Sequence, residues 1–312
     1  AYFFFFFFSQ NRSLLGTVSV GTNELLIPVE TPRGIFSNFV IYTKSILVEQ
    51  TTPSSLLIQD AAASTSNLTF GDKDLDRFQV AGNITWTEAA DVSDVVEYMI
   101  YMAHDRFGSN RSLLGTAPAG SGNFFVEDNT PLLSFTHFVI YSRSSLVEQT
   151  TPSAVVIIDV SAAVEDLSFL DLDLDAAELA GDVTWSPPTS GLEQVNGYGV
   201  YLSDAAYRTR SQVGIVPKGT HVQVVPDSTA QQSFTHVLVY SRSDAFQQST
   251  PAATAISDVS AQAVALEFSD LDLDEYQVGG TLQWQEPADS RYVAYYTAYK
   301  AYLCNNSNSS SD

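Results

Sequence analysis

The sequence predicts an all-β protein, a tandem array of seven-stranded β-sandwich modules of about 99 residues each. Three observations predict this fold class. The sequence repeats itself, its apolar residues alternate with a period of two, and turn residues separate the alternating stretches. No stretch of about ten residues combines a helical period with capping residues. Several short strands in a repeat of this length are typical of two packed sheets.

Long stretches of the sequence recur at a fixed spacing. Residues 12–16 (RSLLG) return as residues 111–115, and residues 48–53 (VEQTTP) return as residues 147–152, in both cases 99 residues later. Pro251 ends a third copy of the second stretch. A repeat of this length is typical of an array in which each copy forms one structural unit.

This spacing divides the chain into four segments. We expect two complete repeats, at 63–161 and 162–260. We expect residues 1–62 to form the C-terminal part of one repeat, and residues 261–312 to form the N-terminal part of a further repeat. Because neither part can bury a sandwich core by itself, each needs either a longer chain or a neighbouring molecule to complete it.

The expected strands follow the same order in each complete repeat. Leu167 and Phe169 alternate with polar neighbours in the first strand, and Val183 and Trp185 alternate in the second. A third strand is expected at 198–201 (YGVY). The late strands are expected at 235–240 (THVLVY) and, in the preceding repeat, at 155–158 (VVII). Turn residues separate such strands at 151–152, 180–181, 186–188 and 217–219.

Recurring aromatic residues are expected to fill the core of each module. They lie 99 residues apart: Trp86, Trp185 and Trp284, and Tyr42, Tyr141 and Tyr240. A buried Trp removes roughly 150 to 250 Å² from water, so it contributes several kcal/mol to the stability of its module. Loss of one Trp is therefore expected to unfold one module while the neighbours survive in part.

These residues carry a resemblance to a known family. The stretches 183–188 (VTWSPP), 198–201 (YGVY) and 235–240 (THVLVY) resemble the fibronectin type III pattern. The resemblance covers every module and implies an immunoglobulin-like sandwich without disulfides. Residues 130–136 (TPLLSFT) replace the family's usual Leu-x-Pro-x-Thr-x-Tyr corner, so the chain is interpreted as a divergent relative.

Charge and cysteine content exclude several functional classes. The 36 acidic and 14 basic side chains give a net charge of −22, which would repel nucleic acid and anionic membrane surfaces. No apolar run is long enough to span a membrane. A single cysteine, Cys304, excludes an internal disulfide framework and a zinc site made of several cysteines. The first residues lack a basic region and a cleavage site, so we expect no signal peptide within this sequence.

Three acidic segments are candidate calcium sites. The aspartates recur with the repeat: Asp72, Asp74 and Asp76; Asp171, Asp173 and Asp175; Asp270, Asp272 and Asp274. In an extended strand, three such carboxylates would share one face about 7 Å apart, and a cation would offset their repulsion. Given the resemblance, Ca²⁺ would then stiffen the junction with the next module. The alternative is a solubilising acidic turn without a metal.

Sequons for N-linked glycans indicate an extracellular or cell-surface location. The candidate acceptors are Asn11, Asn67, Asn83, Asn110, Asn305 and Asn308. Asn67 and Asn83 alternate with inward-facing apolar residues, so their side chains are expected to point outward.

Catalysis is not expected. The four histidines are not paired at ligand spacing, and no hydrolase, metalloprotease or phosphate-binding motif is present. A module repeated several times favours reach and multivalency over one catalytic site. We therefore expect a protein that is not an enzyme.

The expected function is that of a structural subunit of an extracellular fibre, appendage or surface coat. Its copies would associate head to tail, with residues 266–299 of one molecule completed by residues 11–58 of the next. The alternative is a cell-surface adhesin or a carbohydrate-binding array that uses Tyr101, Tyr201 and Tyr207. Both functions have partners outside the chain: other copies of itself, or glycans.

The ends of the sequence are of low complexity. Phe3 to Phe8 would break the strand alternation and expose a large apolar patch. We expect them either to contact a neighbouring subunit or to be an uncertain part of the sequence. The Asn- and Ser-rich residues 305–312 are of similarly low complexity.

Overall fold

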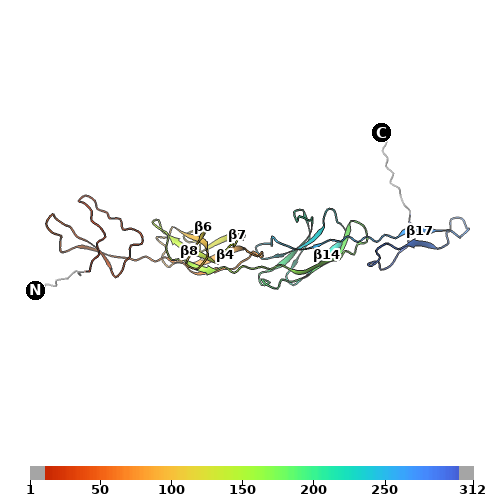
Figure 1. The fold of residues 1–312 in the computed structure, drawn as a ribbon, viewed down its shortest axis with the longest axis horizontal. Helices are drawn as coiled ribbons and strands as arrows, with labels where there is room; N and C mark the ends of the chain where they lie inside the picture. Colours follow the sequence, from red (N-terminus) through yellow and green to blue (C-terminus); the bar gives the residue numbers. More distant parts are fainter. Residues whose placement is uncertain (1–10, 302–312) are drawn as a thin grey trace, which may run out of the picture. The chain divides into compact units, whose positions relative to one another are not determined.

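A computed structural model describes residues 11–301 of the chain. This range forms 18 β-strands and no helix (Figure 1), which confirms the predicted all-β class. Phe3 to Phe8, Cys304, Asn305 and Asn308 lie outside the described residues.

Contacts divide the chain into two compact units. The first combines Ala1–Gly71, Asn83–Val126 and Leu133–Ile158, and the second combines Asp72–Gly82, Glu127–Leu132 and Asp159–Asp312. These borders do not coincide with the repeat borders expected at 63, 162 and 261. The division into four repeat segments therefore stays a prediction.

Strands β3 to β9 form two antiparallel sheets with the orders β3-β4-β7 and β6-β5-β8-β9. Their bounds are β3 Ser66–Phe70, β4 Gln79–Thr87, β5 Glu97–Ala103, β6 Ser112–Pro118, β7 Asn123–Pro131, β8 His137–Arg143 and β9 Ser153–Val156. The segment before them contributes an antiparallel pair, β1 Asn38–Ile41 with β2 Ser54–Leu57.

Strands β10 to β16 repeat this arrangement, with the orders β10-β11-β14 and β13-β12-β15-β16. Their bounds are β10 Glu165–Phe169, β11 Glu178–Ser186, β12 Gly197–Ser203, β13 Arg210–Pro217, β14 Val222–Ala230, β15 His236–Arg242 and β16 Ala252–Ala255. The segment after them contributes β17 Val264–Phe268 and β18 Leu282–Gln285, which pair with each other.

The strand order is that of a fibronectin type III-like or immunoglobulin-like sandwich. Seven strands divide into a sheet of three and a sheet of four in each of the two sets. In immunoglobulin constant domains the fourth strand joins the sheet of the first two strands. Here the fourth strands, β6 and β13, pair with the third strands, β5 and β12. This agrees with the fold that the sequence resemblance implies.

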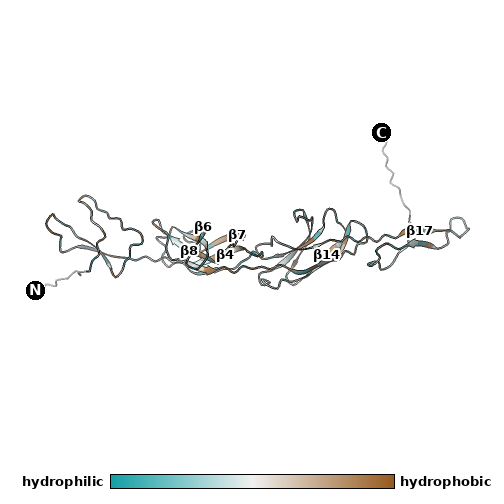
Figure 2. Ribbon diagram, in the orientation of Figure 1, coloured by the Kyte–Doolittle hydropathy of each residue, from teal (hydrophilic) through white to brown (hydrophobic). Residues whose placement is uncertain are grey.

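An edge-on aromatic pair lies in the core of each seven-stranded set. The rings of Trp185 and Tyr198 are 5.4 Å apart and inclined at 66°, and both side chains are buried. The pair of Trp86 and Tyr98 has the same separation of 5.4 Å. Apolar residues lie along these strands (brown in Figure 2) and alternate with polar residues.

The expected core aromatics outside these two sets are more exposed. Tyr141 and Tyr240 are buried, whereas Tyr42 is half-buried and Trp284 is 38% exposed. Trp284 still contacts Tyr296 edge-on at 5.4 Å. Within the described residues, the segment after residue 260 forms two strands in place of seven, so Trp284 is not enclosed in a complete sandwich core.

Candidate functional site

Each acidic segment forms a loop directly after β3, β10 or β17. We define the acidic loops as residues 72–76, 171–175 and 270–274. In the first loop, Asp72 Oδ1 accepts a bond from the N–H of Asp74 at 3.1 Å, and Asp74 Oδ1 accepts one from Asp76 at 2.9 Å. The other loops repeat both bonds. The expected extended strand is therefore wrong, because short Asp side chains compete for the backbone donors that a strand would use.

The first aspartate of each loop fixes the loop to its surroundings. Asp72 Oδ1 also accepts a bond from Ala81 N at 3.0 Å, and Oδ2 accepts one from Val160 N at 2.9 Å. Asp171 makes the equivalent bonds to Ala180 N and Val259 N, at 3.0 and 2.9 Å. Both carboxylates are buried, so these backbone donors replace the water that each has lost.

The second and third aspartates of the first loop bind segments much later in the chain. Asp74 Oδ2 accepts a hydrogen bond from Asn129 N at 2.8 Å. The Asp76 oxygens accept bonds from Ser249 N at 2.5 Å and Thr250 N at 2.9 Å. Asp76 is buried, whereas its counterparts Asp175 and Asp274 are exposed.

The leucine between these aspartates inserts into a hydrophobic core. Leu75 is 1% exposed and belongs to the same core cluster as Trp185, Val195 and Tyr198. Its carbonyl oxygen accepts bonds from Ala162 N at 3.1 Å and from Gln248 Nε2 at 2.9 Å. All of these residues belong to the second compact unit. Leu75 thus anchors the first acidic loop in the apolar core, and the aspartates on either side of Leu75 hold the loop through charge-assisted hydrogen bonds.

The two other loops carry the same anchor in less buried surroundings. Leu174 is half-buried, and its carbonyl oxygen accepts a bond from Ala261 N at 3.0 Å. Leu273 is 97% exposed. The sequence alone does not reveal this role, because an Asp-Leu-Asp pattern also fits a half-buried strand. The signal that could have found it is the recurrence of 248–251 (QSTP) as 149–152 (QTTP) in phase with the acidic loops.

Burial raises the pKa of two carboxyl groups in the first loop. Loss of water raises the pKa of Asp72 to about 7, although three backbone N–H donors act in the opposite direction. Burial also raises the pKa of Asp74. In contrast, backbone hydrogen bonds from Gly279 and Asp272 lower the pKa of the exposed Asp270.

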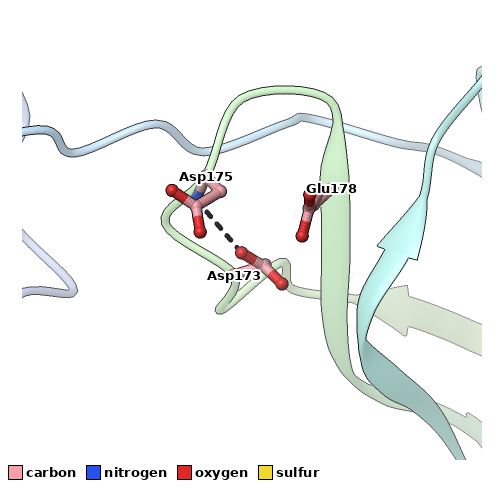
Figure 3. Close-up of side chains that lie close together, drawn as sticks. All are labelled: Asp173, Asp175 and Glu178. Atoms are coloured by element: carbon pink, nitrogen blue, oxygen red, sulfur yellow. Dashed lines mark hydrogen bonds between the residues drawn. The ribbon is translucent and has the colours of Figure 1, made fainter. Parts of the chain in front are cut away.

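The second loop brings three carboxylates together. Within the described residues, oxygens of Asp173, Asp175 and Glu178 lie within 4.8 Å of one another (Figure 3). Carboxylate oxygens are the ligands that Ca²⁺ prefers. Asp173 also accepts backbone bonds from Asp175 N and Ser228 N, as Asp74 does in the first loop. The first repeat differs in having Gln79 in place of Glu178, and its Asp76 accepts bonds from Ser249 N and Thr250 N. The calcium prediction stays a prediction, and this geometry favours the second loop for it.

A second recurring cluster places an arginine against two tyrosine rings. The Arg111 guanidinium lies 4.7 Å from the ring centre of Tyr101 and 4.1 Å from that of Tyr141. Its Nη2 atom is 2.7 Å from Glu148 Oε1, and Tyr101 donates a bond to the same carboxylate. Arg210 lies over Tyr201 in the same way, at 5.0 Å. The repeated RSLLG and VEQTTP stretches are therefore explained by a structural cluster.

The sequon asparagines within the described range are all exposed. They are Asn11, Asn67, Asn83 and Asn110. Asn67 lies at the bulge of β3 and Asn110 lies in a turn, and both have positive φ angles, of 51° and 47°. Glycosylation stays a prediction.

Comparisons with known proteins identify no family for this chain. No family model and no curated protein matches the chain. Among solved structures, the FN1–FN3 domains of chicken CNTN1 are similar at 16% identity, with 71% of this chain and 75% of that chain covered and a TM-score of 0.31.

The sequence predicts that no apolar run is long enough to span a membrane. The described part of the chain contains no helix that is long and apolar enough to cross a bilayer.

Proposed function

We propose that the protein is a structural subunit of an extracellular fibre, appendage or surface coat, and that its copies associate head to tail by strand complementation. The observation that carries this proposal is the exposure of core-type residues in the segments 11–58 and 264–285. The counterparts of Trp284, Leu282 and Ile41 in the seven-stranded sets, which are Trp185, Val183 and Ile140, are buried.

The C-terminal segment lacks cover on its apolar residues. Trp284 is 38% exposed, against 5% for its counterpart Trp185. Leu282 is also exposed, whereas its counterpart Val183 is fully buried. β17 and β18 match β10 and β11, so the strands that would cover them are those that match β12 to β16.

In the N-terminal segment, the apolar residues without cover belong to the strands that match β13 to β16. Ile41 is exposed, whereas its counterpart Ile140 is buried at the centre of β8. This segment carries the counterparts of β13 to β16, four of the strands that are absent around β18.

The register of the complete set specifies how two copies would fit. Val183 of β11 is paired with Gln223 of β14. Their counterparts are Leu282 of one copy and Leu25 of the next, so the proposed pairing places two exposed leucines opposite each other. Paired edges also remove the free backbone donors that an exposed strand leaves. A contact of this heterologous kind repeats without closing and yields filaments.

The test uses the full chain and one matched control. Sedimentation velocity across a concentration series measures association, in about 150 mM salt so that repulsion between chains of charge −22 is screened. Leu282→Asp should abolish association, because a carboxylate would be buried between the copies. Leu133→Asp changes an exposed leucine outside both segments and should associate normally. Equal association of both variants would contradict strand complementation.

The alternative of a carbohydrate-binding array has less support. Arginine side chains lie over the rings of Tyr101 and Tyr201, so these rings are not free to stack on a sugar. Tyr207 is 41% exposed and contacts His236 edge-on. One exposed ring does not make an array of sites.

A further inference from the structure

We infer that the third acidic loop docks into a second copy of this chain, with Leu273 inserted beside that copy's residues 149–151 and Asp274 bound to its backbone. The inference rests on the proposed head-to-tail association and adds a second contact to it. The partner is another copy because the receiving surface occurs in this chain's own sequence.

The chain already contains one formed example of this contact. Leu75 is buried in the core formed by β10 to β16, and Asp76 accepts bonds from the backbone of Ser249 and Thr250. Gln248 donates to the Leu75 carbonyl oxygen, and Ser243 Oγ donates to the Lys73 carbonyl oxygen at 2.9 Å. We define the receiving surface as Ala162, Ser243 and residues 248–250. Both sides lie in one compact unit, so the example is well defined.

The third loop forms the same internal hydrogen bonds as the first loop. Within the described residues, no receiving surface contacts it. Asp272 and Asp274 keep the internal turn bonds of the first loop. Leu273 is 97% exposed, and its neighbours Leu271 and Tyr276 are also exposed. The turn is therefore formed and holds an apolar side chain in water, which is unfavourable unless a partner covers it.

A second receiving surface lies in the first compact unit. Its residues match those of the formed contact one repeat earlier: Ala63, Ser144 and residues 149–151. Thr150 and Thr151 are exposed and are the counterparts of Ser249 and Thr250. Asp76 accepts its bonds from the backbone N–H groups of that pair, and Thr150 and Thr151 offer the same two groups. Within the described residues, no acidic loop contacts this surface.

The space and charge beside Thr151 suit an acidic loop. A hollow of about 400 Å³ is lined by Thr151, Pro152, Arg106 and His137, among others. Arg106 adds a positive charge to the lining of this hollow. In a chain of net charge −22, this is a favourable place for a carboxylate of a second copy.

One pair of positions distinguishes the contact between copies from the contact within the chain. In the formed contact Lys73 Nζ lies 2.8 Å from Gln194 Oε1 and 3.4 Å from Asp244 Oδ1. The third loop has Leu271 in place of Lys73, and the second receiving surface has Ser145 in place of Asp244, beside the exposed Leu146. The contact inside the chain thus pairs Lys73 with Asp244, whereas the contact between copies has Leu271 and Ser145 at these positions and needs no ion pair. If the third loop occupied the surface that holds the first loop, Asp244 would face Leu271 and would lose its ion pair with Lys73. This difference favours docking of each loop on its own surface.

Association of the full chain tests the contact separately from strand complementation. Leu273→Asp should weaken association about 10- to 100-fold, the effect of losing one buried leucine. The monomer should fold as before, because Leu273 is exposed in it. Leu133→Asp is the control at a similarly exposed leucine and should leave association unchanged. Unchanged association of Leu273→Asp, with Leu282→Asp monomeric, would overturn this inference and leave strand complementation standing. A wild-type chain that stays monomeric would overturn both.

Cross-linking between copies gives a second readout. In a Cys304→Ser background, chains carrying Asp274→Cys are mixed with chains carrying Thr150→Cys. Oxidation should yield a disulfide between the two chains. The internal standard is one chain carrying Asp76→Cys and Ser249→Cys, which should close within the chain because these positions are already hydrogen-bonded. If the standard closes and the mixed chains do not join, the inference is wrong.

Discussion

Truncation of the anchor leucine at three equivalent positions separates a structural role of the acidic loop from a merely solubilising one. Leu75 is 1% exposed and packs in the core around Trp185 and Tyr198, so Leu75→Ala should create a cavity there. Such a substitution costs about 2 to 5 kcal/mol when the site is fully buried. The loop's hydrogen bonds use backbone and aspartate atoms, so they survive the change. A loss of about 3 kcal/mol is expected, together with a fall of about 6 to 12 °C in the melting temperature of this unit.

Hydrogen exchange followed by mass spectrometry locates the effect. Amides of β11 and β12 in Leu75→Ala should exchange about 100-fold faster than in the wild type, where global opening controls them. Leu174→Ala, at a half-buried position, should give a smaller change. Leu273→Ala should give almost none in the monomer, since that side chain is 97% exposed. If Leu75→Ala and Leu273→Ala changed the exchange rates equally, the burial of Leu75 would not be what stabilises this unit.

Two further predictions concern charge. Because burial raises the pKa of Asp72 to about 7, its contribution to stability is complete below about pH 4 and is lost as pH rises to 7. Urea midpoints should therefore fall more steeply between pH 4 and 7 for the wild type than for Asp72→Asn, and parallel slopes would contradict the assignment. Calcium should raise the melting temperature of the wild-type chain but not of Glu178→Gln, because the carboxylates within 4.8 Å then lose one ligand. An equal response to calcium in both chains would place any bound ion elsewhere.

The sequence predicted the fold because the signals for it are local and repeated. Alternation around Trp86 and Trp185, together with turn residues at fixed positions, was enough to place most strands of β3 to β16. The resemblance to the type III pattern at 183–188 and 198–201 also pointed to the sandwich that the strand order shows.

The acidic loops could not be predicted in the same way. Asp72, Asp74 and Asp76 alternate like a strand, and the competing Asx turns are visible only once backbone donors are placed. The partners of Asp76, at Ser249 and Thr250, lie more than 170 positions later in the chain. No local pattern specifies so distant a contact. The exposure of Trp284 has a simpler reason, since the two strands described after residue 260 cannot enclose an aromatic residue by themselves.

Electron microscopy of the purified full-length chain tests the central claim most directly. The account predicts filaments at about 150 mM salt, with one axial repeat for each chain, and it predicts that Leu282→Asp yields separate particles under the same conditions. Separate particles of the wild-type chain at every concentration, or filaments of Leu282→Asp indistinguishable from the wild type, would contradict head-to-tail assembly by strand complementation.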